Sequence, residues 1–154
     1  MIKVLFVCLG NICRSPMAEA VLRDKINKQG LEQQITVDSA GTGDWHIGHP
    51  PHEGTRKMLD THVISYEGMA ARQVLSEDFS AFDYIICMDE SNLTNLRKLE
   101  GGIEAVIIQF MDLLPEETLR EVPDPYFTGN FEEVYELMDA GCDVLLSKIV
   151  KEKL

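Results

Sequence analysis

The sequence predicts an α/β fold: a single domain over residues 1–154, built as three layers, α/β/α, around a four-stranded parallel sheet in the order 2-1-3-4. Three observations lead to this prediction. Apolar runs typical of buried strands alternate along the chain with stretches of helical periodicity. A length of 154 residues suits one domain, and no internal repeat divides it. Turn residues close the first strand and lead directly into a helix, so a loop forms at a switch point of the sheet, where ligands bind.

The expected elements follow in chain order. The first strand is almost continuously apolar, as a strand buried on both faces should be, and Gly30 is a natural stop for the first helix. Apolar residues at helical spacing fill the C-terminal stretch after Asn130, which with Glu133 resembles a capping box. The strands are expected at Ile2–Val7, Ile35–Ser39, Phe82–Met88 and Ala105–Phe110, and the helices at Pro16 to about Lys28, His52 to about Thr61, a short stretch after Asp89, and Phe131 to the C-terminus.

The first strand runs into the loop Cys-Leu-Gly-Asn-Ile-Cys-Arg-Ser-Pro, residues 8–16. Ser15 as N-cap and Pro16 at the first helical position would start the helix there. Free backbone N–H groups and the helix dipole then form an anion site, with Gly10 allowing a tight turn. The residues expected to bind a phosphate group are Leu9, Gly10, Asn11, Ile12, Cys13 and Ser15.

Cys8 and Arg14 give this loop its chemistry. A free cysteine has a pKa near 8.5, and helix N-termini and nearby cations lower it to roughly 3.5–7.5. We therefore expect Cys8 to be a thiolate at neutral pH, with the Ser15 hydroxyl bonded to the sulfur, and to attack a bound phosphorus atom. Arg14 offers a planar fork for two phosphoryl oxygens. The alternative, an inert buried cysteine and a surface arginine, does not explain why these residues occur together.

Asp124 lies between two prolines, which fix the backbone around it. It is either part of a plain turn or a rigidly held general acid that protonates a leaving phenolate and then activates water. Trp45, the single tryptophan, lies in the irregular stretch 41–51 and is expected to form an aromatic wall of the pocket with Tyr126 and Ile12, rather than a packing plug. The histidines of this stretch are expected to be surface residues, with no metal site.

The motifs together resemble the low-molecular-weight protein tyrosine phosphatases across nearly the whole chain. The resemblance rests on Cys8-x5-Arg14-Ser15, Ser39-Ala40-Gly41-Thr42, Trp45, Pro51-His52, Ala71-Arg72-Gln73, Phe82-Asp83-Tyr84, Met88 to Asn92, and Asp124-Pro125-Tyr126. It implies hydrolysis of phosphotyrosine through a phosphocysteine, with Cys8, Arg14 and Asp124 as catalytic residues and no cofactor or metal. Met69 stands where many members have a histidine behind the phosphate loop, and Phe127 where some have a second tyrosine.

Three residues are expected to assist this site. The end of the second strand brings Ser39 to the rim of the phosphate loop. Asp89 either pairs with Arg14 or Arg72, or caps the helix that follows it. Cys13 either packs under the loop or forms a reversible disulfide with Cys8.

Other functions stay open as alternatives. An arsenate reductase would need further cysteines, and a protein arginine phosphatase is expected to have threonine at Ile12. A redox-sensing or phosphotyrosine-binding module without turnover would lack Cys8 or Asp124. The net charge of −12 argues against nucleic-acid and anionic-membrane partners. No secretory signal or disulfide pattern occurs, so we expect a cytoplasmic protein. We also expect a monomer or weak dimer, whose partners are phosphotyrosine-containing proteins.

Overall fold

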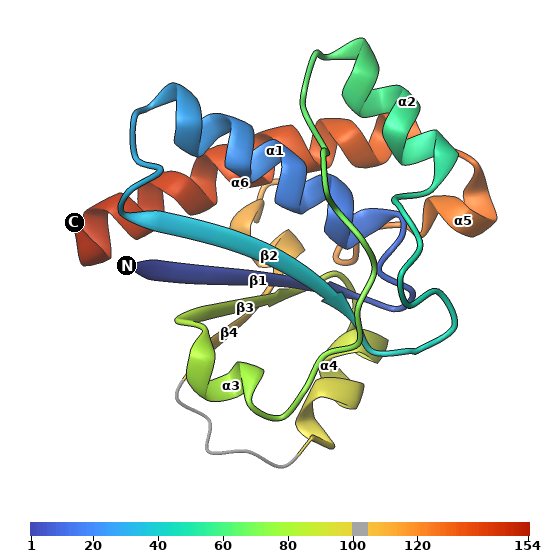
Figure 1. Cartoon of the computed structure of the whole chain (residues 1–154), viewed down its shortest axis with the longest axis horizontal. Coiled ribbons are helices and arrows are strands. Elements are labelled where there is room, and N and C mark those ends of the chain that lie inside the picture. The colour runs from blue at the N-terminus through green and yellow to red at the C-terminus, as the bar shows by residue number, and fades with distance from the viewer. Residues whose placement is uncertain (100–104) are drawn as a thin grey trace.

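The computed structural model describes residues 1–99 and 105–154, and within them four parallel strands form one sheet (Figure 1). The strands are β1 (Ile2–Cys8), β2 (Ile35–Gly41), β3 (Tyr84–Cys87) and β4 (Val106–Gln109). Their order is β2-β1-β3-β4, which confirms the predicted topology. Because the strands are parallel, their carboxyl ends meet at one edge of the sheet.

Helices cover both faces of the sheet, as the α/β/α prediction requires (Figure 1). The ribbon shows α1, α2 and α6 on one side and α3 and α4 on the other. The helical elements are α1 (Arg14–Lys28), α2 (Glu53–Thr61), α3 (Asp78–Ala81), α4 (Glu90–Arg97), the 3-10 helix η1 (Phe110–Leu113), α5 (Pro125–Thr128) and α6 (Phe131–Lys153).

The core is divided between the two faces. The larger cluster packs α1 and α6 against β1, and the smaller one lies between the sheet and α3 and α4. The apolar stripe predicted for the C-terminal helix is buried along α6, from Val134 to Ile149. Helix α1 is buried on nearly every side in its first half, because it lies between the sheet and α6. Burial on all sides hides polar residues of α1 that an amphipathic pattern would place in solvent.

The element boundaries differ from the prediction at several places. Strands β1 and β2 are longer because Cys8 pairs with Gly41 at the functional edge. Strand β3 starts at Tyr84, after Asp83 turns its carboxylate to accept the Lys3 N–H. Phe110 belongs to η1 rather than to β4. Helix α3 lies at the end of a stretch expected as loop.

The start of α6 also departs from a full capping box. The Asn130 side chain accepts the Glu133 N–H at 3.0 Å, as predicted. The Asn130 N–H donates to Thr128 Oγ1 at 3.1 Å, and not to the Glu133 side chain, which would accept it in a full capping box.

Candidate active site

The loop after β1 forms the floor of the site, and α1 begins inside it. Helix α1 starts at Arg14 with Cys13 as N-cap, so the prediction of Ser15 as N-cap was wrong. Ser15 is instead within the first turn, where its hydroxyl lies 3.0 Å from Cys8 Sγ and its N–H donates to the same sulfur at 3.4 Å. The Ser15 hydroxyl, which the local sequence pattern assigned to the helix cap, is thus hydrogen-bonded to the Cys8 sulfur instead.

The peptide groups of this loop are oriented by bonds to the surrounding body. The carbonyls of Cys8 and Leu9 accept N–H groups from residues 42 and 43, and the Ile12 carbonyl accepts the His52 N–H at 2.7 Å. The Cys13 carbonyl accepts the hydroxyl of Thr55 at 3.0 Å. In a trans peptide the C=O and the next N–H point in opposite directions. These carbonyls point out of the loop, so the N–H groups that follow them point into it, as an anion site requires.

Asn11 gives the loop its sharp turn. Its φ of 56° is in the left-handed region, which asparagine tolerates better than most residues. The prediction placed the tight turn at Gly10, which does not have a positive φ. Gly41 on β2 permits the loop to lie close to the sheet, because a Cβ at that position would be 2.8 Å from the Leu9 carbonyl oxygen.

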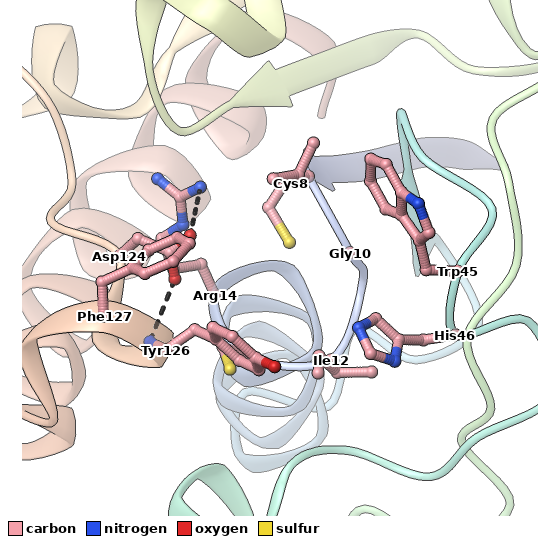
Figure 2. A pocket seen from close by; sticks show the side chains of 11 residues that line it. Cys8, Gly10, Ile12, Arg14, Trp45, His46, Asp124, Tyr126 and Phe127 are labelled. Atoms are coloured by element: carbon pink, nitrogen blue, oxygen red, sulfur yellow. Dashed lines mark hydrogen bonds and ion pairs between the residues drawn. The ribbon is translucent and has the colours of Figure 1, made fainter.

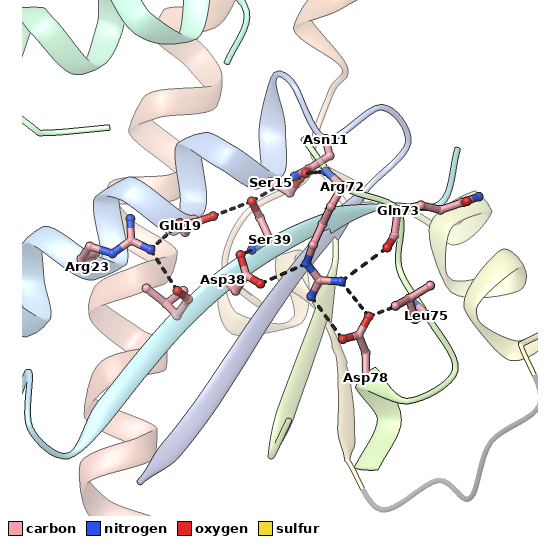
Figure 3. A network of polar contacts seen from close by, with 11 residues as sticks. Asn11, Ser15, Glu19, Arg23, Asp38, Ser39, Arg72, Gln73, Leu75 and Asp78 are labelled. Carbon is pink, nitrogen blue, oxygen red and sulfur yellow. Dashed lines mark hydrogen bonds and ion pairs between the residues drawn. The ribbon is translucent and has the colours of Figure 1, made fainter. Parts of the chain in front are cut away.

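A polar network beneath the loop holds Asn11 in place (Figure 3). Its side-chain amide donates to Ser15 Oγ at 2.8 Å and to Ser39 Oγ at 2.9 Å, and its Oδ1 accepts the Arg72 N–H at 3.0 Å. Ser39 therefore lies where its supporting role was predicted. The Ser39 hydroxyl donates in turn to Glu19 at 2.6 Å. Sequence reasoning missed Glu19, because a glutamate in a helix is usually exposed.

Arg14 is buried and anchored from one side. Its Nη1 donates to Asp89 Oδ2 at 2.8 Å and to the Val122 carbonyl at 2.9 Å, while its Nη2 lies 3.5 Å from Asp124 Oδ2. Burial lowers the pKa of this guanidinium, but the neighbouring negative charges, that of Cys8 first, outweigh burial and raise it above its ordinary value. Arg14 is thus a permanent cation beside the Cys8 sulfur.

Asp89 has both of the roles that were weighed for it. Its Oδ2 accepts Arg14, and its Oδ1 accepts the Asn92 N–H at 2.8 Å, which caps α4. Arg72 does not reach it, since the Arg72 guanidinium pairs with Asp38 and Asp78. One carboxylate therefore ties the phosphate loop to the end of β3.

Asp124 lies at the mouth of the site from the other side. It is the N-cap of α5, and its Oδ1 accepts the Tyr126 N–H at 3.1 Å. This cap fixes the carboxylate, while 23% of the side chain stays exposed. Arg14 and Asp124 come from positions 110 residues apart, yet they face the same space as Cys8 (Figure 2).

These residues line a cavity of about 400 Å³ whose walls are aromatic (Figure 2). Trp45 forms one wall, 67% exposed, and its indole ring lies so close to Gly43 that a Cβ there would be 2.0 Å from a ring carbon. Tyr126 lies on the opposite side, as predicted, with its ring centroid 6.4 Å from that of His46. The lining consists of Cys8, Leu9, Gly10, Ile12, Cys13, Arg14, Trp45, His46, Asp124, Tyr126 and Phe127.

Two residues of this lining, His46 and Phe127, were not predicted to belong to it. His46 and His52 are partly exposed, in keeping with the expectation of surface histidines. The Nδ1 of His52 also accepts the Gly54 N–H at 3.0 Å, and its ring stacks on Phe131. Contacts between distant segments, not local pattern, decide these positions.

Cys13 belongs to the lining of the cavity, whereas Met69 does not. Cys13 is buried, and its burial, with the charge of Cys8 next, raises the pKa of its thiol to about 12. Met69 is half-buried and packs against the larger core cluster. It makes no polar contact with the loop, so the network through Asn11 supplies that support.

Comparison with known proteins agrees with this geometry. A sequence model of the family described as low molecular weight phosphotyrosine protein phosphatase matches residues 3–154. The chain belongs to this family. Low molecular weight protein-tyrosine-phosphatase YfkJ of Bacillus subtilis is 56% identical to the chain over 154 residues, covering 99% of each. Low molecular weight protein-tyrosine-phosphatase PtpA of Staphylococcus aureus is 45% identical, covering 99% of the chain and 96% of PtpA.

Solved structures of the phosphatase family show the same fold. The crystal structure of YfkJ matches with a TM-score of 0.97 at 55% identity, covering 100% of this chain and 98% of that one. The crystal structure of a Drosophila arginine phosphatase matches with a TM-score of 0.90 at 33% identity, covering 99% of this chain and 100% of that one. One α/β scaffold is therefore shared by a protein named as a tyrosine phosphatase and a protein named as an arginine phosphatase.

Two further features concern partners. In the described part of the chain, no three His, Cys, Asp or Glu side chains come together as metal ligands would. No helix within residues 1–99 and 105–154 is both long and apolar enough to cross a membrane.

Proposed function

We propose that residues 1–154 form one phosphatase domain that hydrolyses phosphotyrosine in proteins through a phosphocysteine intermediate. The observation that carries this proposal is the convergence of Cys8, Arg14 and Asp124 on one cavity with aromatic walls. Family membership supports the cysteine nucleophile. We further propose that the protein is cytoplasmic and monomeric or weakly dimeric. We also propose that it has no nucleic-acid or membrane partner, and the strongly acidic composition supports this last proposal.

The reaction follows from the positions of these groups. The phosphoryl group binds in the loop, where backbone N–H groups and Arg14 compensate its charge. Cys8 Sγ attacks phosphorus, a P–S bond forms, and the P–O bond to the phenolic oxygen breaks while Asp124 donates a proton to that oxygen. A water molecule then attacks phosphorus while Asp124 accepts its proton, so a new P–O bond forms, the P–S bond breaks, and inorganic phosphate and the Cys8 thiolate are released.

The cavity favours a phenyl ring between the phosphate and the protein substrate. Trp45 and Tyr126 offer flat apolar faces at the mouth, and the phosphate loop lies at the floor. A short phosphoserine side chain would not carry its phosphate to that floor. Ile12 lies in the lining and is 8% exposed, so it gives the ring an apolar contact and offers no hydrogen bond to a guanidinium.

The second candidate is a protein arginine phosphatase, because a family member of that name has the same fold. The test is single-turnover mixing of the wild-type protein and Cys8→Ser with phosphotyrosine, phosphoarginine and phosphoserine, without metal. We expect release from phosphotyrosine alone and none from Cys8→Ser. Faster release from phosphoarginine would overturn the substrate assignment but keep the mechanism, and no release from any of the three would favour a redox or binding module.

A further inference from the structure

Glu19 is a buried carboxylate beneath the phosphate loop, outside the substrate cavity (Figure 3). Its side chain is 6% exposed, and it lies in the first half of α1. One oxygen accepts the Ser39 hydroxyl at 2.6 Å, and the other pairs with Arg23. Arg23 is itself fixed, since it also donates to the Val37 carbonyl at 3.0 Å. A buried carboxylate needs such partners to remain charged.

The directions of the hydrogen bonds that start at Glu19 are determined by chemistry. An ionised carboxylate only accepts, so the single hydrogen of Ser39 Oγ points to Glu19. Ser39 Oγ can then only accept from Asn11, which donates to it at 2.9 Å. The Arg72 N–H donates to Asn11 Oδ1 at 3.0 Å. The bonds to Ser39 and to the Arg72 N–H therefore give the Asn11 amide the same orientation, with its NH₂ group toward the two serines.

This orientation decides where the Ser15 hydrogen goes. Ser15 Oγ accepts from Asn11 at 2.8 Å, so its own hydrogen remains available to Cys8 Sγ at 3.0 Å. A reversed Asn11 amide would offer Oδ1 to Ser15 instead, and would draw that hydrogen away from the sulfur. A hydrogen bond donated to the thiolate stabilises it relative to the thiol.

We propose that Glu19, held by Arg23, is a positioning residue for the reaction. It sets the donor direction along Ser39, Asn11 and Ser15, so that the last hydroxyl donates to the Cys8 thiolate. The proposal rests on the proposed role of Cys8 as nucleophile. Glu19 touches neither the substrate cavity nor Cys8, so its hydrogen bonds connect to the sulfur through the three side chains between them.

The sign of one measurement separates this relay from a simple charge effect. Glu19→Gln removes a negative charge, and loss of a negative charge near a thiolate favours the thiolate. The relay predicts the opposite result. Arg23 only donates, so it would hold the amide oxygen of the introduced glutamine and turn the NH₂ group toward Ser39. Ser39 would then accept from that NH₂ group and point its hydrogen at Asn11, which disfavours the orientation that serves Ser15.

The experiment measures iodoacetamide modification of Cys8 between pH 5 and 8 by mass spectrometry of the Cys8 peptide. We expect Glu19→Gln to move the pH midpoint of modification upward by about one unit, which slows modification below the midpoint about tenfold. Glu67→Gln is the matched control. Glu67 lines the same 300 Å³ cavity as Glu19, with Arg23 and Asp38 as the other charged groups there, and its exposed carboxylate has no bond to Ser39.

A second variant identifies the route. Ser39→Ala changes no charge and should move the midpoint upward, and the double variant with Glu19→Gln should add nothing to it. An unmoved or lowered midpoint in Glu19→Gln would overturn the relay. So would an unmoved midpoint in Ser39→Ala, a result that can be obtained even where Glu19→Gln fails to fold. Wild-type protein that is not modified at Cys8, or not protected by inorganic phosphate, would count against the proposed function instead.

Discussion

Replacing Asp124 with asparagine tests the proposed general acid with little disturbance of the structure. The substitution keeps an oxygen for the Tyr126 N–H, and asparagine caps helices as well as aspartate does. Arg14 loses only its longest contact, the one at 3.5 Å, and keeps Asp89 and the Val122 carbonyl. We therefore expect the free energy of unfolding to change by less than about 1 kcal/mol, and inhibition by inorganic phosphate to be retained.

The chemical step should respond far more strongly. Loss of a general acid lowers kcat by roughly 10²–10⁴, equivalent to about 3–5.5 kcal/mol in the barrier. Tyrosine is a poor leaving group without a proton, whereas a nitrophenolate leaves without one. The assay is single-turnover release from phosphotyrosine and from nitrophenyl phosphate by Asp124→Asn and by the parent. In the first step, we expect Asp124→Asn to lower the rate of release greatly for phosphotyrosine and only slightly for nitrophenyl phosphate.

The second step gives an independent readout of the same residue. Asp124 is also proposed to accept the proton of the attacking water, so the asparagine variant should accumulate the phosphocysteine. With nitrophenyl phosphate this appears as a burst of nitrophenolate equal to the enzyme present, followed by slow turnover. Equal losses for the two leaving groups, with no burst, would refute the assignment of Asp124 as acid and base.

Three further outcomes are expected. Iodoacetamide at pH 7 should modify Cys8 and leave Cys13 unmodified by mass spectrometry, because burial raises the pKa of Cys13 to about 12; labelling of both at equal rates would contradict this. Trp45→Ala should raise KM for phosphotyrosine peptides several-fold while inhibition by inorganic phosphate stays unchanged, since the indole is proposed to contact the phenyl ring of the substrate and not its phosphate; parallel changes in both constants would argue otherwise. Gly141→Ala should lower stability by about 1–3 kcal/mol in urea denaturation, although alanine normally favours a helix, because its Cβ would be 2.2 Å from the Phe110 ring; a stabilised variant would show that this ring moves freely.

The phosphate loop could be predicted from the sequence because its chemistry is local. Cys8 and Arg14 are six residues apart. Cys8 ends the first strand and Arg14 begins the first helix, so the short loop between them places both at one site. The place of Asp124 at the cavity was also predictable, since flanking prolines mark a rigid turn and the resemblance implies that this residue belongs to the site. The alternation of strands and helices predicted a parallel sheet with helices on both faces, and the expected order 2-1-3-4 placed the loop at a switch point of that sheet.

The remainder depends on contacts that no local pattern contains. Glu19 lies in a helix whose N-terminal half is buried on nearly all sides, so the usual expectation of a solvated glutamate fails. His46 joins the cavity because the stretch after β2 folds back over the loop, where its ring meets Tyr126. The Ser-Pro signature predicts the start of α1 to within one turn. The Ser15 hydroxyl does not cap the helix, because it is hydrogen-bonded to the nearby Cys8 sulfur.

The contacts of Arg14 explain how an acidic protein can both hold this cation and release it to a substrate. Its Nη1 has two short bonds, to Asp89 and to the Val122 carbonyl, and these fix the plane of the guanidinium. Among residues 1–99 and 105–154, the contact of Nη2 is with Asp124 alone, at 3.5 Å. A bound phosphoryl dianion competes for Nη2 far better than a single carboxylate at that distance. We expect substrate binding to exchange this contact, so that Nη2 binds a phosphoryl oxygen and releases the Asp124 carboxyl. The anchor on Nη1 and the weak contact on Nη2 would thus couple phosphate binding to the release of Asp124 for its proposed role in the next step.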